Sequence, residues 1–508
     1  MKNIFAFIFV VFVTPQNISA QTFKAAMDSA ATAQQLVGVS AIAICGNEIQ
    51  QIYHFGKSDI ARNKPVTDST LYRIASISKS VTAIALMKLY ERGLFGLDDD
   101  ISTTLGFSVR SPSFPTVPIT FRKLLSHTSG LQDGTGYDNF LSDTYANPTN
   151  PPSLKEILLP NGQFYTSDMW RTESPGTFFI YSNLNFGIVG TLVEKLSERR
   201  FDLFVKDSIL APLQITGGFN VRSLPNINNL SVLYRSGTPQ TDNYQGVAPA
   251  PLDYTNYPIG KNAVAFGPQG GLRVSASGLT KILQMLMGNG TYQNNVTILQ
   301  PATAALMRSD QWTFNGQNGD NYGNFFNSWG LGIERVLGTV GADVIVPNKI
   351  FYGHAGDAYG LLSDMFYDPI KKSGIVFITN GYTGASGYSN GSSSTFFAPE
   401  EAAFKAYTQY LYNTCAASGV VESDKKIPLS SLKISPNPFT DTSIISWENL
   451  QNPVNLRLTD EHGKIVWTQN VTENSNCVFS RPTISAGIYF LAAKDAVGKV
   501  AAAKMILK

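Results

Sequence analysis

The sequence predicts a mixed α and β fold in which one sheet is built from the two ends of a long unit, with a helical lobe inserted between them. Alternating apolar segments typical of strands occur at 38–45 and 49–55 and again between 350 and 380, and helical periodicity dominates the stretch between. Short strands and turns then fill 432–508, which predicts a small β-sandwich after the main unit.

The first twenty residues predict a secretory signal peptide. Lys2 precedes a short apolar core at 4–13, and Ser19 and Ala20 stand before Gln21. The core is too short to anchor the chain across a bilayer, and no later apolar run reaches that length. We therefore expect an exported protein without a transmembrane segment.

The elements of the long unit follow from local patterns. A helical pattern covers 23–36, and two strands flank the turn residues Gly46 and Asn47, which is a hairpin signal. Residues 215–270 are rich in Asn, Pro, Tyr and Gly and have little periodicity, so we expect irregular structure there. Helices are expected at 81–91, 121–125, 154–158, 186–196, 201–209, 279–287, 301–307 and 400–412.

Length and composition suggest how the chain divides. A chain of 508 residues exceeds what one hydrophobic core usually holds. The composition turns polar after 415, which is typical of a linker. The predicted parts are a signal peptide at 1–20, a main unit at 21–415, a linker at 416–431 and a C-terminal domain at 432–508.

Charge and cysteine content exclude some functions and leave others open. The net charge of +2 has no basic footprint, so nucleic-acid binding is unsupported. Four histidines without ligand spacing argue against a zinc site. Cys45, Cys415 and Cys477 are an odd number, so at least one is unpaired; Cys45 and Cys415 could form a disulfide, but we favour a buried free thiol.

Ser76 and Lys79 form the candidate catalytic pair. Apolar residues recur at helical spacing from Val81 onward, so Ser76 lies at or near a helix N-terminus, and a lysine three residues later falls on the same face. The partial positive charge of the helix start favours an alkoxide or oxyanion there. The same tetrapeptide recurs at 423–426 and 430–433, but in a polar stretch without a helix behind it.

A Ser-Lys pair still needs a second proton-handling group, and Tyr-x-Asn is the candidate pattern. Tyr181-Ser182-Asn183 follows an apolar stretch and leads into a predicted helix, whereas the other matches lie in polar loops. The alternative role for Tyr181 is a helix-start tyrosine bonded to the backbone. The other matches begin at Tyr137, Tyr254, Tyr322 and Tyr388.

A third candidate element is His354-Ala355-Gly356, a strand-edge histidine followed by small residues. Small side chains let a substrate lie against the strand as an added partner. His54-Phe55-Gly56 matches the same pattern but lies before the serine. For a lone histidine in a strand, a structural role is the alternative.

In chain order these elements resemble the serine hydrolases related to class C β-lactamases and D-alanyl-D-alanine carboxypeptidases. The resemblance covers about residues 25–412 and implies an α/β sandwich, with an antiparallel sheet flanked by helices, a helical lobe and the active site between them. The motifs that carry it are RIASISK at 73–79, LLSHTSGL at 124–131, YSN at 181–183, GGL at 270–272, WGLG at 329–332 and HAG at 354–356.

The resemblance implies a role for each matching residue. Ser76 would be the acylated nucleophile, and Lys79 and Tyr181 would transfer protons, with the choice of base left open. Asn183 would contact the substrate, the backbone N–H groups of Ser76 and Asp357 would form the oxyanion hole, and no cofactor or metal is implied. His127 would fix a loop.

The third motif departs from the family. Where β-lactamases have Lys-Thr-Gly and the carboxypeptidases often have His-Thr-Gly, this chain has His354-Ala355-Gly356. Ala355 offers no hydroxyl to a substrate carboxylate, and a histidine is mostly neutral near pH 7 where a lysine would be cationic.

The last 77 residues resemble the C-terminal sorting domain of type IX secretion. SPNPF at 435–439, Asp460 with Gly463-Lys464, GIY at 487–489 and the Lys-rich terminus carry this likeness. It implies the secretion machinery as a partner and the cell surface or the medium as the location. A generic β-sandwich appendage is the alternative.

Together these observations predict a secreted serine hydrolase that works through an acyl-enzyme on a small-molecule or peptide substrate. A D-alanyl-D-alanine carboxypeptidase-like activity is favoured, with a small-ester or amide hydrolase and a β-lactamase as alternatives. A catalytically inactive surface-binding protein is the alternative from another class.

Overall fold

The computed structural model describes residues 15–293, 295–415, 431–448, 450–460, 465–472, 474–496 and 500–507. The chain forms two compact units, one ending at Ser418 and the other beginning at Gly419. Most of the predicted signal peptide and of the predicted linker lies outside the described residues, and both stay predictions. Residues 15–20, assigned above to the signal peptide, begin helix α1 (Pro15–Ala33).

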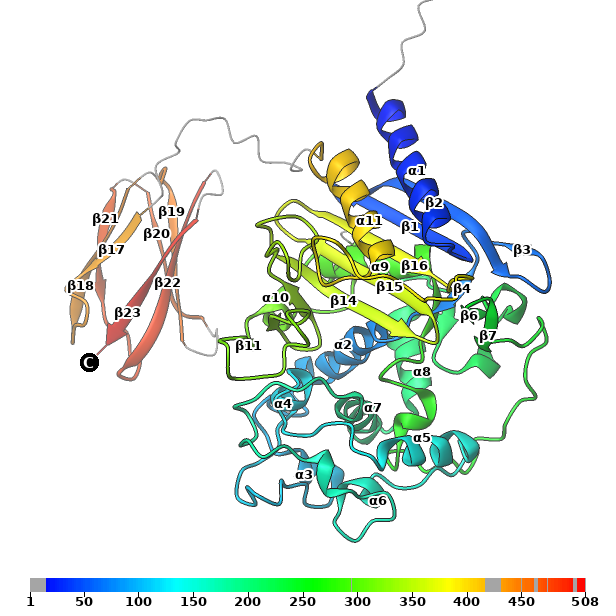
Figure 1. Cartoon of the computed structure of the whole chain (residues 1–508). Coiled ribbons are helices and arrows are strands. Elements are labelled where there is room, and N and C mark those ends of the chain that lie inside the picture. The colour runs from blue at the N-terminus through cyan, green and yellow to red at the C-terminus, as the bar shows by residue number, and fades with distance from the viewer. Residues whose placement is uncertain are drawn as a thin grey trace, which may run out of the picture. The chain divides into compact units, whose positions relative to one another are not determined.

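A nine-stranded antiparallel sheet forms the centre of the first unit (Figure 1). Strands from its two ends meet in the middle, where β1 pairs with β16 and Ile42 lies opposite Val376. This confirms the predicted sheet. Across it, the strands run in the order β11 (Trp312–Thr313), β12 (Ser328–Trp329), β13 (Glu334–Val336), β14 (Phe351–Ala358), β15 (Leu361–Asp368), β16 (Ser373–Thr379), β1 (Gly38–Cys45), β2 (Glu48–Asp59) and β3 (Lys64–Pro65).

The predicted hairpin joins β1 and β2. Gly46 and Asn47 have φ values of 62° and 71°, the left-handed backbone that a tight two-residue hairpin turn needs. Gly and Asn tolerate this region best, so this turn could be located from the sequence. The second strand runs on to Asp59, four residues beyond its predicted end.

Helices cover both faces of the sheet. On one face α1 and α11 (Ala398–Tyr407) lie side by side, and Val39, Ala41 and Phe377 pack against them in one apolar cluster (Figure 1). Ile42 and Val376 point the other way, into the larger cluster with α2 (Ile77–Glu91) and α9 (Ala276–Met287). Both faces are buried, which explains why β1 is apolar at nearly every position.

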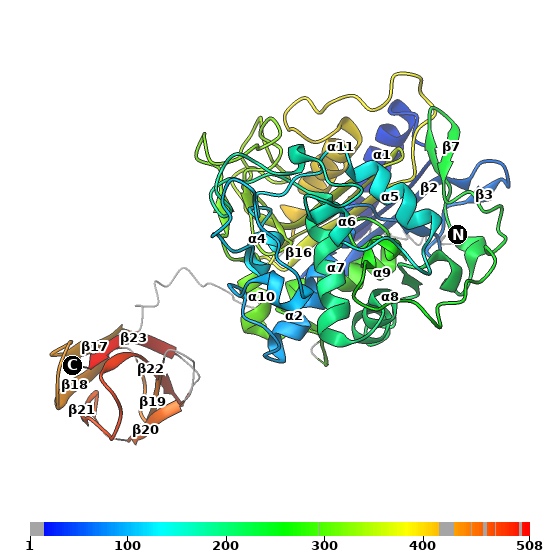
Figure 2. The same cartoon turned by 90° about the horizontal axis from the view of Figure 1, so that it is seen from below.

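The helical lobe lies between the strands in sequence and extends from the α2 side of the sheet (Figure 2). Helix α2 is apolar nearly all round and packs against α7 inside the main core. The helices from α2 to α8 are α2 (Ile77–Glu91), α3 (Ile101–Leu105), α4 (Phe121–Leu125), α5 (Tyr137–Ala146), α6 (Lys155–Leu158), α7 (Asn183–Ser197) and α8 (Phe201–Val205), which a π-turn at Lys206–Leu210 extends.

One helix of the lobe differs from the prediction. Tyr137 was placed in a polar loop, but it is the first residue of α5 and is buried. The helix begins after Gly136 without a side-chain cap, and its outer face is polar, so neither start signal nor strong periodicity marks it. Tertiary burial of Tyr137 and Phe140 stabilises it instead.

Residues 215–270 are mainly irregular, as predicted. They contain 3₁₀ turns and short strands, and β8, just after them, pairs with β4 and β5. The remaining elements of this unit are β4 (Leu71–Arg73), β5 (Gly217–Gly218), β6 (Leu233–Arg235), β7 (Thr238–Thr241), β8 (Arg273–Ser275), β9 (Thr291–Tyr292), β10 (Val296–Thr297), α10 (Pro301–Arg308), a π-turn at Thr408–Tyr412, and 3₁₀ turns at Ser167–Met169, Val221–Ser223, Ile227–Asn229 and Ala263–Phe266.

Cys45 and Cys415 form a disulfide, with their Cα atoms 5.5 Å apart. The favoured free thiol is therefore wrong for these two residues. Cys45 ends β1 and Cys415 follows the last helical turn, so their proximity depends on the long-range pairing of the sheet and could not be read from spacing. Cys477 is the free cysteine of the described residues.

The second unit is the predicted β-sandwich. Alternate residues of β19, namely Val454, Leu456 and Leu458, are buried, whereas Asn455 and Arg457 between them are exposed. One sheet contains β17 (Ser431–Ser435), β18 (Thr442–Glu448) and β21 (Asn476–Ser480); the other contains β20 (Ile465–Val471), β19 (Val454–Thr459), β22 (Gly487–Asp495) and β23 (Val500–Leu507).

Candidate active site

Ser76 lies where β4 turns into α2. Ala75 has a φ of 44°, a left-handed conformation that costs an alanine about 1 kcal/mol, and the turn leaves Ser76 just before the first helical residue, Ile77. Ser76 therefore lies at the helix N-terminus, as predicted, although the helix begins four residues before the periodic stretch that starts at Val81. Ser76 sits at the positive end of the helix, where a developing negative charge is stabilised.

Lys79 lies one helical turn further on, with its ammonium group beside Ser76. Its Nζ is 3.0 Å from Ser76 Oγ and donates to Asn183 Oδ1 at 2.7 Å and to the Gln269 carbonyl at 2.8 Å. The side chain is fully buried, and burial lowers the pKa of Lys79 from 10.5 to about 7, although the charge of Asp133 opposes this shift. A large share of this lysine is therefore neutral at pH 7.

Asp133 orients Asn183, and the sequence analysis missed it. The Nδ2 group of Asn183 donates to Asp133 Oδ2 at 2.8 Å, which turns Asn183 Oδ1 towards Lys79. Asp133 also accepts the backbone N–H of Leu184 at 2.9 Å and so caps the start of α7. Fifty residues separate the two partners, so no local pattern could have linked them.

Tyr181 is partly buried and lies between two rings. It stacks on His127 at a centroid distance of 4.5 Å and on Phe326 at 5.1 Å, and Lys79 Nζ lies 4.8 Å from its ring centre. Burial raises the pKa of Tyr181 well above its ordinary value, and the hydroxyl of Ser76 opposes that shift. The phenol therefore keeps its proton near neutral pH.

His127 packs against the ring of Tyr181 and bonds to the backbone next to it. Its Nδ1 accepts the backbone N–H of Ser182 at 3.1 Å, and burial lowers the pKa of His127 well below 6.5. A neutral ring with Nε2 protonated satisfies this geometry. His127 thus holds the segment of Tyr181 in place.

Strand β14 forms the opposite wall of the site. His354 lies on it with its ring 6.2 Å from that of Tyr181, and burial lowers the pKa of His354 to about 3. The strand is not at the edge of the sheet, but its pairing with β13 ends at Gly353. Among the described residues, 354–358 therefore pair on one side only, with β15, and the predicted open edge is present over this segment.

Gly356 lets β14 approach the serine. A Cβ at this position would lie 2.8 Å from the Ile74 carbonyl, 3.1 Å from Ser76 N and 2.5 Å from Ser363 Oγ. Only glycine permits this contact. The close approach brings the backbone around Asp357 next to that of Ser76.

One pocket of about 340 Å³ is lined by Ser76, Tyr181 and residues of β14, whereas Lys79, Asn183 and His354 are not among its lining residues. It contains the hydroxyls of Ser76 and Tyr181, the small residues of β14 and several aromatic side chains. Tyr322, another of the Tyr-x-Asn matches, lies at its rim and donates to the Tyr181 carbonyl at 3.3 Å. The remaining lining residues are Phe325, Phe326, Ala355, Gly356, Asp357, Leu362, Phe397 and Glu400.

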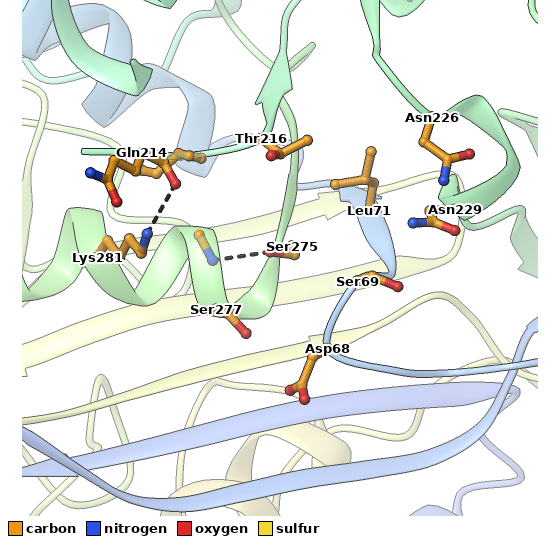
Figure 3. A pocket seen from close by; sticks show the side chains of 12 residues that line it. Asp68, Ser69, Leu71, Gln214, Thr216, Asn226, Asn229, Ser275, Ser277 and Lys281 are labelled. Atoms are coloured by element: carbon orange, nitrogen blue, oxygen red, sulfur yellow. Dashed lines mark hydrogen bonds between the residues drawn. The ribbon is translucent and has the colours of Figure 1, made fainter. Parts of the chain in front are cut away.

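A second serine makes a similar chain of contacts but is not accessible. Ser40 Oγ lies 3.0 Å from His54 Nδ1, and His54 Nε2 lies 2.8 Å from Asp68. Asp68 borders the pocket in Figure 3, where Lys281 is held by the Gln214 carbonyl. Ser40 itself is fully buried and bonded to a tyrosine, so no substrate can reach it.

The other two Ser-x-x-Lys sequences have no such setting. Residues 423–426 lie outside the described part of the chain. Of 430–433, the described residues belong to β17 in the second unit, which is a strand and places no lysine one helical turn from a serine.

The fold and this arrangement define the class of protein, and the comparisons agree. Residues 20–392 match the family model described as Beta-lactamase, and the chain belongs to this family. Residues 433–508 match the model described as Secretion system C-terminal sorting domain, which indicates export to the cell surface or the medium. None of the described helices is long and apolar enough to cross a membrane.

Particular relatives are distant. Penicillin-binding protein 4* of Bacillus subtilis is 28% identical over 219 residues, or 42% of this chain and 45% of that protein. Protein Rv1367c of Mycobacterium tuberculosis is 27% identical over 287 residues, or 52% of this chain and 66% of that protein. This chain thus matches less than half of the Bacillus relative.

Among solved structures, the fold resembles that of the octameric penicillin-binding protein homologue from Pyrococcus abyssi. The TM-score is 0.54 at 18% identity, and the alignment covers 96% of each chain. At this identity the likeness concerns the fold alone.

Proposed function

We propose that the protein is an exported serine hydrolase that acylates Ser76. The observation that carries the proposal is the buried contact of 3.0 Å between Lys79 Nζ and Ser76 Oγ, together with a lysine pKa of about 7. A neutral amine at that distance can accept the serine proton, which an ordinary lysine rarely does at pH 7.

The proposed reaction has two halves. Ser76 Oγ bonds to the substrate carbonyl carbon while its proton passes to Lys79, and the proton then passes to the leaving alcohol or amine as its bond to carbon breaks. Tyr181 is proposed to relay that proton, because its hydroxyl lies in the same pocket and keeps its own proton at neutral pH. Water then attacks the acyl-serine and regenerates Ser76.

The proposed oxyanion hole consists of the backbone N–H groups of Ser76 and Asp357. The helix start at Ser76 and the close approach of Gly356 support this role. Asn183 is proposed to contact the substrate and to keep Lys79 in place, and His354, Ala355 and Gly356 to form the strand along which the substrate lies.

For the substrate, we propose a D-alanyl-D-alanine carboxypeptidase-like activity, as the relationship to penicillin-binding protein 4* suggests. A second candidate is a hydrolase of neutral esters or amides. The neutral His354 favours it, because neither that ring nor Ala355 can act as a cation or hydroxyl for a substrate carboxylate.

Covalent labelling tests the proposal. A fluorescent fluorophosphonate and a fluorescent penicillin should label the wild-type protein, and Ser76→Ala should abolish labelling and turnover. Ser423→Ala, at the start of another Ser-x-x-Lys sequence, is the matched control and should label fully. Labelling that persists in Ser76→Ala would disprove the assignment, and a folded wild-type protein that is never labelled would favour an inactive binding protein.

A further inference from the structure

A second cavity, of about 360 Å³, is lined by Arg73, three residues before Ser76, and by Gly271. The segment Gln269–Gly271 is the wall between this cavity and the candidate active site. On one side, the Gln269 carbonyl accepts from Lys79; on the other, the Gln269 side chain donates to the Tyr145 hydroxyl at 3.0 Å, and Tyr145 lines the cavity. The Gly270 backbone also lies against that of Ala75, next to Ser76.

Three arginines line this cavity, and no carboxylate does: they are Arg73, Arg222 and Arg273. Arg73 and Arg273 lie directly opposite each other on the paired strands β4 and β8. Like charges in such a cross-strand pair repel each other. An anion beside either guanidinium would reduce this repulsion.

One of the two arginines has an anionic partner within the chain. Arg273 is nearly buried and forms a two-pronged ion pair with Asp242, at 2.8 and 3.1 Å. Its remaining contacts are to the carbonyls of Phe219 and Gly271. Arg273 is thus neutralised, and its bonds to Asp242, Phe219 and Gly271 engage all three of its nitrogens.

Arg73 has no such partner among the residues that the structure describes. Its Nε donates to the Gly270 carbonyl at 2.9 Å, and its guanidinium lies 4.9 Å from the ring centre of Tyr359. The backbone contact and the ring fix the plane of the guanidinium and leave the two terminal nitrogens for a ligand. A fixed guanidinium fork suits the two oxygens of a carboxylate.

Resting on the function proposed above, we propose that this cavity is a subsite for an anionic group of the substrate, with Arg73 as the residue that binds it. The group is a carboxylate within a few bonds of the scissile carbonyl, because only the Gln269–Gly271 wall separates Arg73 from Lys79. Arg222 adds positive charge further out. Tyr145, Tyr254 and Tyr359 provide flat surfaces for the adjoining part of the substrate.

With this subsite, a substrate carboxylate is bound by Arg73 on β4 and not by the residues of β14. His354 and Ala355 carry no charge near pH 7, whereas Arg73 is a permanent cation. A substrate would therefore lie across Ser76 with its anionic end towards β4 and β8 and its neutral end along the open edge of β14.

Two matched ester pairs test the inference on the full chain. In the first pair the charge is on the acyl side: 4-nitrophenyl hydrogen glutarate against 4-nitrophenyl butyrate. In the second it is on the leaving group: 4-acetoxybenzoate against 4-acetoxybenzamide. Wild type should prefer the anionic ester by at least tenfold in kcat/KM in one pair, and that pair tells which side of the scissile bond faces Arg73.

Arg73→Gln should reduce that preference by tenfold to a hundredfold, as expected for a lost hydrogen bond to a charged group. Arg73→Lys should restore part of the preference for the anionic ester, and Arg222→Gln should lower that preference less than Arg73→Gln does. Arg92→Gln, which removes an exposed arginine at the end of α2, is the control and should leave it unchanged. A wild type without preference in either pair, or a preference that Arg73→Gln leaves intact, would overturn the inference.

Direct binding keeps this test separate from the proposed function. Glutarate should bind to Ser76→Ala in ligand-observed NMR, whereas glutaramide should not, and binding should be lost when Arg73→Gln is added. Glutarate binding without any ester turnover or labelling would reject the hydrolase but support the subsite. Ester turnover without Arg73-dependent binding or preference would support the hydrolase but reject the subsite.

Discussion

Acidification should suppress acylation of Ser76 with a midpoint near pH 7, because protonated Lys79 cannot accept the serine proton. With a pKa of about 7, about half of the lysine is neutral at pH 7 and about 1% at pH 5. We therefore expect kcat/KM to fall about a hundredfold from its plateau to pH 5. A lysine with the ordinary pKa of 10.5 would be only about 0.03% neutral at pH 7, so its rate would still be rising at pH 9.

The assay is kcat/KM for 4-nitrophenyl butyrate from pH 5 to 9 in a buffer of constant ionic strength. Glu400 lines the same pocket, and burial raises its pKa to about 8, so Glu400→Gln is measured beside wild type. The midpoint near 7 should remain in that variant. Lys88→Gln, on the same helix but bonded to the Ile298 carbonyl, is the matched lysine control.

Asp133→Asn tests the direction in which the pKa of Lys79 responds to a nearby charge. The negative charge of Asp133 favours the protonated lysine, so its removal should lower the pKa of Lys79 and move the midpoint to lower pH. A rate that does not vary between pH 5 and 9, or a midpoint that disappears in Glu400→Gln, would refute the reasoning.

Three further outcomes follow from the structure. Gly356→Ala should lower kcat/KM at least a hundredfold in purified protein, because its Cβ would meet the Ile74 carbonyl at 2.8 Å and push β14 away from Ser76. Ala355→Thr should leave the ratio of kcat/KM for a D-Ala-D-Ala peptide to that for a neutral ester unchanged, since it adds a hydroxyl to the β14 wall of the pocket and not to the wall of Arg73, where the carboxylate is inferred to bind. Replacement of both Cys45 and Cys415 by serine should lower the unfolding free energy by about 2 to 4 kcal/mol in denaturant titrations, because the disulfide closes a long loop.

Each of these outcomes has its own control. Gly218 has open space where a Cβ would be added, so Gly218→Ala should keep activity. A ratio that shifts towards the peptide in Ala355→Thr would mean that the carboxylate is bound at β14 and not at Arg73. Wild type treated with a reductant should lose the same stability as the double serine variant, and equal stability of all forms would contradict the predicted role of the disulfide.

Local patterns were sufficient for the part of the site that lies within one helical turn. Ser76 and Lys79 are three residues apart at the start of α2, so their proximity follows from helix geometry alone. The sheet could also be predicted from the sequence, because β1 and β16 are long, apolar and flanked by turn residues. Tyr181 required more, since only its apolar flank distinguished it from the other tyrosines of the same pattern.

Contacts between distant segments could not be predicted. Asp133 reaches Asn183 across fifty residues, and the Gln269 carbonyl that fixes Lys79 is a backbone atom without any sequence signature. Arg73 stands in the serine motif itself, but its unpaired charge becomes visible only when β4 is seen beside β8, where Asp242 neutralises Arg273 and not Arg73. Such features depend on tertiary geometry, which periodicity does not encode.

The pairing of β1 with β16 also sets when the pocket beside Ser76 can form. The first strand of the sheet stays without its inner neighbour until residue 379 has been made, and the disulfide joins residues 370 positions apart. Contacts of such high contact order form late and slowly. A nascent or partly exported chain therefore has Ser76 but no wall from β14 beside it, and it gains a complete pocket only just before the sorting domain emerges behind it.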